Sequence, residues 1–564
     1  MRSANVLVVT LVLFAGLAWS DEGHHHALTE EEIGSVHFST SCAQAVESGI
    51  NHAVALLHSF EYEATRATFE AVVVKDPKCA MAEWGIAMSH YHGLWGNGDA
   101  AAGREALKRA QTIASANPAT TAREHAYINA LAEIYDGQSS DAYARDTAFE
   151  SRMAALQSRY PDDTEAAVFH ALTLSITAPK TDRTFANQRK CGEILEPLFA
   201  KLPHHPGVAH YLIHCYDNPV LAEKGLAAAR TYATIAPASA HANHMPSHIF
   251  TRVGSWDESI HSNLRSQELA AQAETTSKNG EARDQRLHAM DYLEYAYLQS
   301  GQVTQAKAVL AEMNSLKPMS DLTLTGDYAV AAIPARSALE LGNWENATGL
   351  QVRSEGVPWA QAITWVAIGI GGARSQHLDS ASHAEESLAS LRDTIAKQNS
   401  EYWSKQVEVQ RREVLAWIQQ QTGKSQDAIA TMRSAADLEE SMDKHAVTPG
   451  AVLPAREMLA QLLVLANHPQ EAFAEFESVL KVAPNRFNAL YGAATAADAS
   501  GSQAAAQKYF RKLTEVAVGD ERPELVAARK KIAITAKEEI LRRGRDSNPR
   551  YPLRYVRRRI VICR

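Results

Sequence analysis

The stretch Gly49–Lys78, GINHAVALLHSFEYEATRATFEAVVVKDPK, decides the fold of this chain. The residues of this stretch that carry the pattern are Ala53, Leu56, Tyr62 and Phe69, with Pro77 as the closing residue. Apolar residues at helical spacing on either side of a polar turn predict two antiparallel helices. One such hairpin cannot bury its apolar faces alone, so it needs stacked copies of itself as neighbours.

Further copies of this hairpin follow along the chain. Similar signatures lie at Ala222–Pro237, Gly254–Ile260, Gly301–Ala306, Gly342–Ala347, Gly423–Ala428, Glu471–Pro484 and Gly501–Ala505. Strand-type runs of Val, Ile and Thr are almost absent after the first twenty residues. The sequence therefore predicts an all-α chain of helix-turn-helix units from residue 43 to residue 535.

This pattern resembles the tetratricopeptide repeat superfamily, although Thr65 stands where that family usually has Ala. The segments His37–Cys42, Cys79–Gly85 and His244–Phe250 are similar to a group of exported bacterial repeat proteins. The resemblance implies a right-handed superhelical solenoid with a concave groove. It also implies a non-catalytic scaffold that binds a protein, a peptide or another extended ligand, and no enzyme activity.

The N-terminus has the features of a secretory leader. Arg2 precedes the apolar run Val6–Leu17, and small residues at Ala18 and Ser20 predict a signal peptide over residues 1–20. A retained N-terminal anchor is the alternative, although the run is short for a membrane span, and no later segment has 18 uninterrupted apolar residues. We expect an exported protein, periplasmic or secreted, with no membrane span in the mature chain.

Beyond the leader, the chain divides into four predicted parts. Residues 21–42 form an N-terminal segment that contains His24–His26, residues 43–270 and 271–535 form two repeat arrays, and residues 536–564 form a basic tail. The stretch from Arg542 to Arg564 has nine Arg and one Asp. A basic arm of this kind can contact anionic lipid or nucleic acid, but we expect a disordered extension without a function.

Composition and motifs exclude several function classes. Of the 564 residues, 46% are hydrophobic and 21% charged, as in soluble folded proteins, and the net charge of -9 gives no indication of nucleic acid binding. The sequence has no G-x-S-x-G, no H-E-x-x-H and no phosphate-binding loop, and Gly369–Gly372 lacks the preceding strand of a dinucleotide site. We therefore expect no catalytic residues.

The cysteines of the repeat region form an even set. In an oxidising compartment, Cys42, Cys79, Cys191 and Cys215 predict disulfides, with free buried thiols as the alternative. Cys42 precedes the first hairpin and Cys79 follows it, so the two residues lie at the same end of that hairpin. Cys191 and Cys215 flank a turn at similar distances, which allows a second bridge.

Two H-x-x-x-H segments lie one repeat length apart. His210 and His214 precede His244 and His248 by 34 residues each (244 − 210 = 248 − 214 = 34). Residues four apart share a helix face, and the superfamily resemblance implies that these places point into the concave groove. The groove floor is therefore expected to be a polar strip of His210, His214, His244, His248, His288, Asp291 and Tyr295.

Three interpretations of this strip remain open. The first is a groove that hydrogen-bonds a polypeptide or another extended ligand and needs no cofactor. The second is a copper or zinc site made by His210, His214, His244 and His248, because two histidines four residues apart can hold one ion. The third is a set of structural histidines between helices. In all three interpretations, a new helix is expected to begin near Met245, because a proline such as Pro246 is unfavourable inside a helix.

Overall fold

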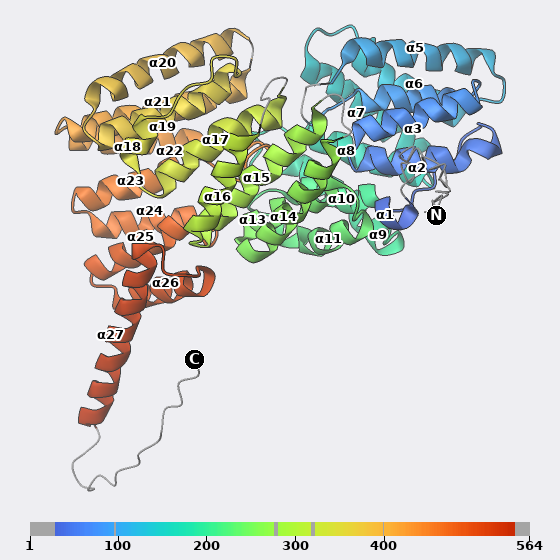
Figure 1. The fold of residues 1–564 in the computed structure, drawn as a ribbon. Coiled ribbons are helices and arrows are strands. Elements are labelled where there is room, and N and C mark those ends of the chain that lie inside the picture. The colour runs from blue at the N-terminus through green and yellow to red at the C-terminus, as the bar shows by residue number, and fades with distance from the viewer. Residues whose placement is uncertain (1–28, 95–97, 276–279, 317–321, 399, 547–564) are drawn as a thin grey trace, which may run out of the picture.

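The computed structural model of the chain describes residues 29–94, 98–275, 280–316, 322–398 and 400–546. Within these ranges the regular elements are helices, and no strand occurs (Figure 1). The predicted leader, His24–His26 and the tail beyond Asp546 lie outside the described residues. No described helix is long and apolar enough to cross a membrane.

The helices alternate along the chain between two classes, which form the two arms of each hairpin. The first helices are α2 (Glu47–His58), α4 (Ala80–Ser89), α6 (Ala122–Tyr135), α8 (Thr164–Ile176), α10 (Pro206–Tyr216), α12 (Ala240–His244) with α13 (Pro246–Val253), α15 (Glu281–Gln299), α17 (Leu324–Glu340), α19 (Pro358–Arg374), α21 (Glu401–Gln421), α23 (Ala455–Leu465) and α25 (Phe487–Ala499). The second helices are α3 (Tyr62–Lys75), α5 (Ala100–Ala116), α7 (Ala142–Arg159), α9 (Ala186–Lys201), α11 (Ala222–Ile235), α14 (Trp256–Ala273), α16 (Val303–Ser315), α18 (Trp344–Thr348), α20 (Leu378–Lys397), α22 (Ser425–Glu440), α24 (Pro469–Val482) and α26 (Gln503–Val516). Three further elements are α1 (Glu30–Ile33), η1 (Gln44–Val46) and α27 (Pro523–Asp546).

The units stack in the way that a helical-repeat solenoid requires. Each first helix packs against its own second helix, and most first helices also pack against the first helix of the next unit. Gly254 and Gly301, in the turns between the two arms, have φ of 70° and 80°, which a residue with a Cβ rarely adopts. The predicted all-α solenoid of stacked helix-turn-helix units is confirmed. The handedness of the superhelix stays a prediction.

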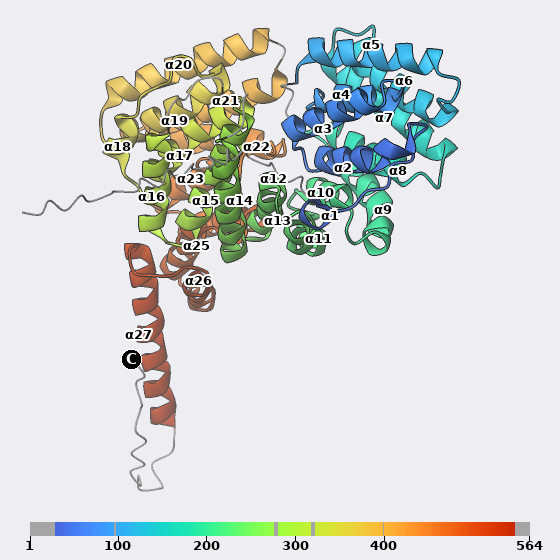
Figure 2. The same ribbon diagram turned by 45° about the vertical axis from the view of Figure 1, so that its right-hand side comes forward.

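The array also folds back on itself. Helix α2 contacts α10, and α15 contacts α25, although several units separate the members of each pair. The buried apolar residues form one large core before residue 251, another after residue 327, and a smaller one between them. Figures 1 and 2 show the two halves side by side, with α27 extending away from the body.

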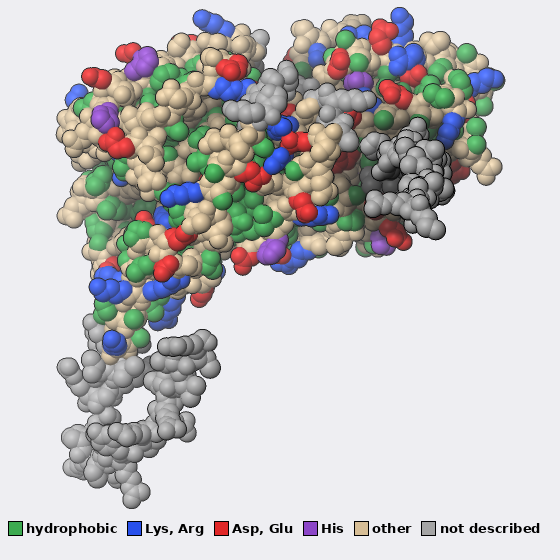
Figure 3. Space-filling model, viewed as in Figure 1, with side chains coloured by type: hydrophobic (Ala, Val, Ile, Leu, Met, Phe, Trp, Pro, Cys, Tyr) green, Lys and Arg blue, Asp and Glu red, His purple; other side chains and the backbone are tan. Residues whose placement is uncertain are grey.

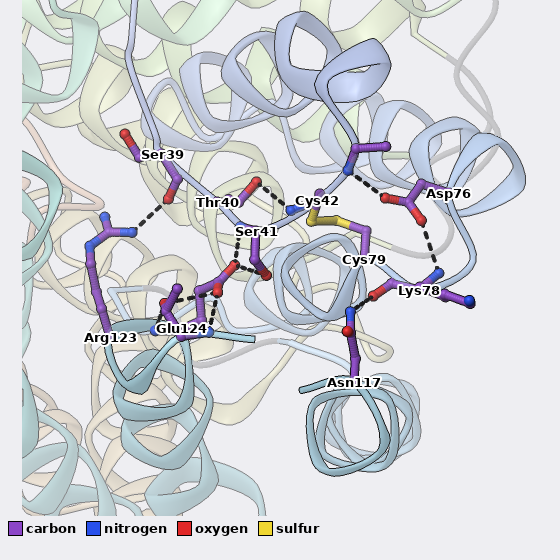
Figure 4. Close-up of a disulfide and its surroundings, with 12 residues drawn as sticks. Ser39, Thr40, Ser41, Cys42, Asp76, Lys78, Cys79, Asn117, Arg123 and Glu124 are labelled. Atoms are coloured by element: carbon purple, nitrogen blue, oxygen red, sulfur yellow. Dashed lines mark hydrogen bonds between the residues drawn. A yellow bond between two sulfur atoms is a disulfide. The ribbon is translucent and has the colours of Figure 1, made fainter. Parts of the chain in front are cut away.

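Both predicted disulfides are present. Cys42–Cys79 joins the two ends of the α2–α3 hairpin with a Cα–Cα distance of 4.8 Å, and the Cα atoms of Cys191–Cys215 are 6.0 Å apart. Figure 4 shows that Asp76 supports the first bridge, because its carboxylate accepts hydrogen bonds from the backbone N–H groups of residues 43 and 78.

An irregular segment at residues 441–454, which we call the strap, connects α22 to α23. The Tyr292 hydroxyl of α15 contacts the carbonyl oxygens of Ala446 at 3.1 Å and Thr448 at 2.9 Å, and the Tyr328 hydroxyl of α17 contacts Thr448 Oγ1 at 2.8 Å. The strap therefore covers part of the first-helix face that was predicted to receive a ligand.

Candidate metal centre

Four helices bring six histidines together. Triad 1 consists of His210 and His214 on α10 with His241 on α12, and triad 2 consists of His244 at the end of α12, His248 on α13 and His288 on α15. The potential ligand atoms of each triad lie within 4.8 Å of one another. The triads are neighbours, since the ring centroids of His214 and His248 are 6.2 Å apart.

The helix break at Met245 preserves the alignment of triad 2. As predicted, Pro246 is the first residue of a new helix, where its missing N–H costs no hydrogen bond. Met245 itself keeps helical dihedrals, with φ of −53° and ψ of −37°. His244 and His248 therefore still share one face, four residues apart, and their Nε2 atoms are 3.0 Å apart.

The ring tautomers of triad 2 follow from its outer partners. His248 Nδ1 lies 2.9 Å from the Asp217 carboxylate, which can only accept, so Nδ1 carries the proton. His244 Nδ1 lies 2.7 Å from Asn263 Oδ1, while Asn263 Nδ2 donates to the Ser259 carbonyl at 2.8 Å and so fixes which amide atom is the oxygen. Both neutral rings therefore direct an Nε2 lone pair at the other.

Triad 1 has a related arrangement. His210 Nδ1 donates to the carbonyl oxygen of His58 at 2.6 Å, which leaves a lone pair on His210 Nε2. The Nε2 atoms of His214 and His241 approach this lone pair at 3.0 and 3.1 Å. One of the two rings can donate an N–H to His210, so the contacts of this triad are less constrained than those of triad 2.

Burial keeps these imidazoles neutral. Desolvation lowers the pKa of all six below its usual value, and in most of them a neighbouring imidazole lowers it further. For His248, burial is opposed by the Asp217 carboxylate. Burial also acts against ionisation of Asp217, but Lys444 and Arg252, at 3.1 and 2.8 Å, hold its pKa well below the usual range.

A third cluster beside triad 1 needs no ion. His58 Nε2 and His205 Nε2 lie 2.7 and 2.8 Å from the two oxygens of Glu165, and Tyr211 Oη lies 3.0 Å from His58 Nδ1. The two imidazoles lower the pKa of the buried Glu165 carboxyl against the effect of desolvation. Because each ring nitrogen nearest to Glu165 can donate to it, this cluster is satisfied by protein groups and fixes α2 beneath triad 1.

The structure corrects the expected polar groove floor. His210, His248 and Asp291 are 0% exposed, and Tyr295 is 3% exposed. Asp291 pairs with the buried Arg336, not with a ligand at the surface. Neighbouring first helices, the strap and the α15–α25 contact cover most of the strip, and His214 alone of its seven residues is half-buried, so the strip is not an open groove floor. Figure 3 shows only isolated histidines on the face in view.

Several residues of the centre were missing from the predicted set. His241 joins triad 1 although it lies outside the 34-residue register, and its only sequence signal is its place three residues before His244. Asp217, Asn263 and the His58 carbonyl have no local signal at all, because none of them lies on the helix that carries the ring that it orients.

A cavity of about 330 Å³ reaches both triads. Its lining includes His241 of triad 1 and His244 and His288 of triad 2, together with Arg66 and Asp284. This cavity gives a small ion a route to buried ligands, and it gives a bound ion space for a ligand in a position that the protein does not fill.

Comparison with known proteins gives structural likeness only. No family model matches the chain, and no curated protein matches it in sequence. Similar solved structures include the human IFIT1 dimer with m7Gppp-AAAA (10% identity, 82% of this chain, 95% of that chain, TM-score 0.33) and yeast Tom70 (10% identity, 88% of this chain, 90% of that chain, TM-score 0.28). Scores this low carry no conclusion about function, and the fold assignment depends on the helix packing above.

Proposed function

We propose that this chain is a metal-binding protein that holds copper or zinc ions at triads 1 and 2. The observation that supports the proposal most strongly is the contact between His244 Nε2 and His248 Nε2 at 3.0 Å. Both rings donate their Nδ1 proton elsewhere, so two lone pairs face each other in a buried place, where polar atoms normally have partners. A cation between the two nitrogens replaces this repulsion with two bonds.

The spacing of the nitrogens suits one ion. Two imidazole nitrogens at the usual zinc–nitrogen distance of about 2.0–2.1 Å lie roughly 3.3 Å apart across a tetrahedral ion. The observed 3.0 Å in triad 2, and 3.0 and 3.1 Å in triad 1, require only small movements. His288 adds a third imidazole to triad 2, and its ring centroid is 4.3 Å from that of His244.

The chemistry of the ligand atoms restricts which metal ion the triads can bind. Neutral imidazoles favour zinc and copper over magnesium or calcium, which prefer oxygen ligands. The four cysteines of the repeat region are in disulfides and offer no thiolate. Asp217 and the His58 carbonyl are outer partners of the kind that orient metal-bound histidines.

The proposed role is binding without catalysis, in an exported protein. The two disulfides support an oxidising compartment, in agreement with the predicted leader. Burial of the strip favours a metal over a polypeptide as its ligand. A protein or peptide partner elsewhere on the array stays a prediction.

Metal analysis of protein purified without an affinity tag tests the proposal. After loading with copper or zinc and removal of the excess, we expect one ion per triad, with the triad 2 ion lost in His248→Ala. His170→Ala is the matched control, because His170 is 4% exposed and its ring nitrogens bond Gln157 and Glu150 instead of another histidine. Equal metal content in the two variants, or no retained metal in the wild type, would refute the proposal.

A further inference from the structure

Glu413, in the middle of α21, has a buried carboxyl group that lacks a counter-ion. It is 4% exposed, and among the residues that the structure describes its side chain has no hydrogen bond and no ion pair. A buried carboxyl without a partner is costly, so its retention indicates either a neutral protonated acid or a site for a ligand.

This carboxyl group lines a second cavity, of about 210 Å³, far along the chain from the histidines. Glu439 of α22 lines the same cavity and accepts a hydrogen bond from the Ala455 backbone N–H at 3.0 Å. Burial, and then the nearby Glu439, raise the pKa of Glu413, and burial raises the pKa of Glu439 to about 7. The two acids therefore share an environment in which an added positive charge is favourable.

Arg456 lowers the pKa of Glu439, but no cation of the described ranges acts in this way on Glu413, and the cations of this cavity form their ion pairs with other carboxylates. Lys444 and Arg252 both contact Asp217, at 3.1 and 2.8 Å, and Arg456 contacts Glu475 at 2.6 Å. Lys444 and Arg252 share Asp217, Arg252 also contacts Asp443, and none of the three cations forms an ion pair with Glu413.

The other end of the cavity is aromatic. Trp359 of α19 and Trp403 of α21 stack with centroids 4.5 Å apart and planes at 18°, and both are half-buried in the cavity wall. Gln406 and Gln410 line the path along α21 between Trp403 and Glu413. With a rise of about 1.5 Å per residue, the ten residues between these two ends span roughly 15 Å.

We propose that this cavity binds a small organic ammonium compound, with its charged group between Glu413 and Glu439 and its apolar part directed along α21 toward Trp403. A desolvated ammonium needs a paired carboxylate, and aromatic faces favour both apolar groups and cations. A volume of about 210 Å³ and the strap as one wall favour a free small molecule over a protein side chain. The cavity contains none of the six histidines, although Arg252 and Lys444 of its wall also contact Asp217, the partner of His248.

Calorimetric titration with three probes of one shape tests this site in the full chain. Benzylamine carries the cation, benzyl alcohol is its neutral analogue and benzoate carries the opposite charge. We expect saturable binding of benzylamine, at least about tenfold weaker binding of benzyl alcohol, and no binding of benzoate. Loss of one hydrogen bond between a charged ligand group and a carboxylate lowers the affinity by about this factor.

Two variants and a control locate the contact. Glu413→Gln keeps the shape of the side chain and should weaken benzylamine binding about tenfold or more. Glu439→Gln should also weaken benzylamine binding about tenfold or more, so the site remains testable if Glu413→Gln does not fold. Glu401→Gln is the control, because Glu401 is exposed on the same helix and pairs with Lys405. Unchanged affinity in Glu413→Gln, equal binding of the alcohol, or no saturable binding of benzylamine would overturn the proposal.

Discussion

Replacing Asp217 by Asn should weaken metal binding at triad 2 without removing a ligand. The carboxylate accepts the Nδ1 proton of His248 at 2.9 Å and so holds that ring with Nε2 free for the ion. Loss of an outer partner of a metal-bound histidine typically lowers affinity 10- to 100-fold, which is about 1.4 to 2.7 kcal/mol. We expect Asp217→Asn to fall in this range for zinc or copper.

The same change also disturbs the ion pairs of Arg252 and Lys444, so it needs a control within that network. Asp443→Asn provides one, because Asp443 contacts Arg252 Nη2 at 3.1 Å and is hydrogen-bonded to no histidine in the described part of the chain. Both variants remove one carboxylate from around the same guanidinium. The difference between them therefore reports the contact with the imidazole.

Competition against a coloured chelator measures both affinities in the same buffer. The reasoning holds if Asp217→Asn binds the metal 10- to 100-fold more weakly than Asp443→Asn, while both variants melt cooperatively. It fails if the two affinities agree within experimental error, since the tautomer of His248 would then not matter for binding.

Three further predictions concern the fold. Changing Cys42 and Cys79 to Ser removes a bridge between residues 37 apart in sequence, and the entropy of the opened loop should lower the free energy of unfolding by about 4 kcal/mol. Thermal or denaturant unfolding measures this loss, and an unchanged unfolding transition would contradict it. Arg486→Met leaves two buried carboxylates unpaired and should cost about 3–5 kcal/mol, whereas the exposed Arg265→Met should change stability by less than about 0.5 kcal/mol. Burial raises the pKa of Asp284 from 3.8 to about 6. The stabilisation that the protonated Asp284 gives the folded state is therefore fully present below pH 3.8 and is lost as the pH rises to about 6. In Asp284→Asn, the decrease of the unfolding free energy with pH across this range should disappear.

The sequence determined the local and repeated features of this protein. Hairpin units follow from helical spacing and turn glycines such as Gly254, and both are properties of a few neighbouring residues. The Cys42–Cys79 bridge follows from the geometry of a single hairpin. Neighbouring units are copies of each other, so the 34-residue offset between His214 and His248 also placed these two rings close together in space.

Only the tertiary structure decided which faces are covered. The array folds back so that α2 meets α10 and α15 meets α25, and the strap lies on the concave side, which buries a strip that repeat geometry alone leaves open. The partners that fix the ring tautomers, Asp217 and Asn263, lie outside the helices of their rings, so their positions depend on how neighbouring helices pack. The contacts of α2 with α10 and of α15 with α25 depend on the summed curvature of many units, and no short stretch of sequence encodes that curvature.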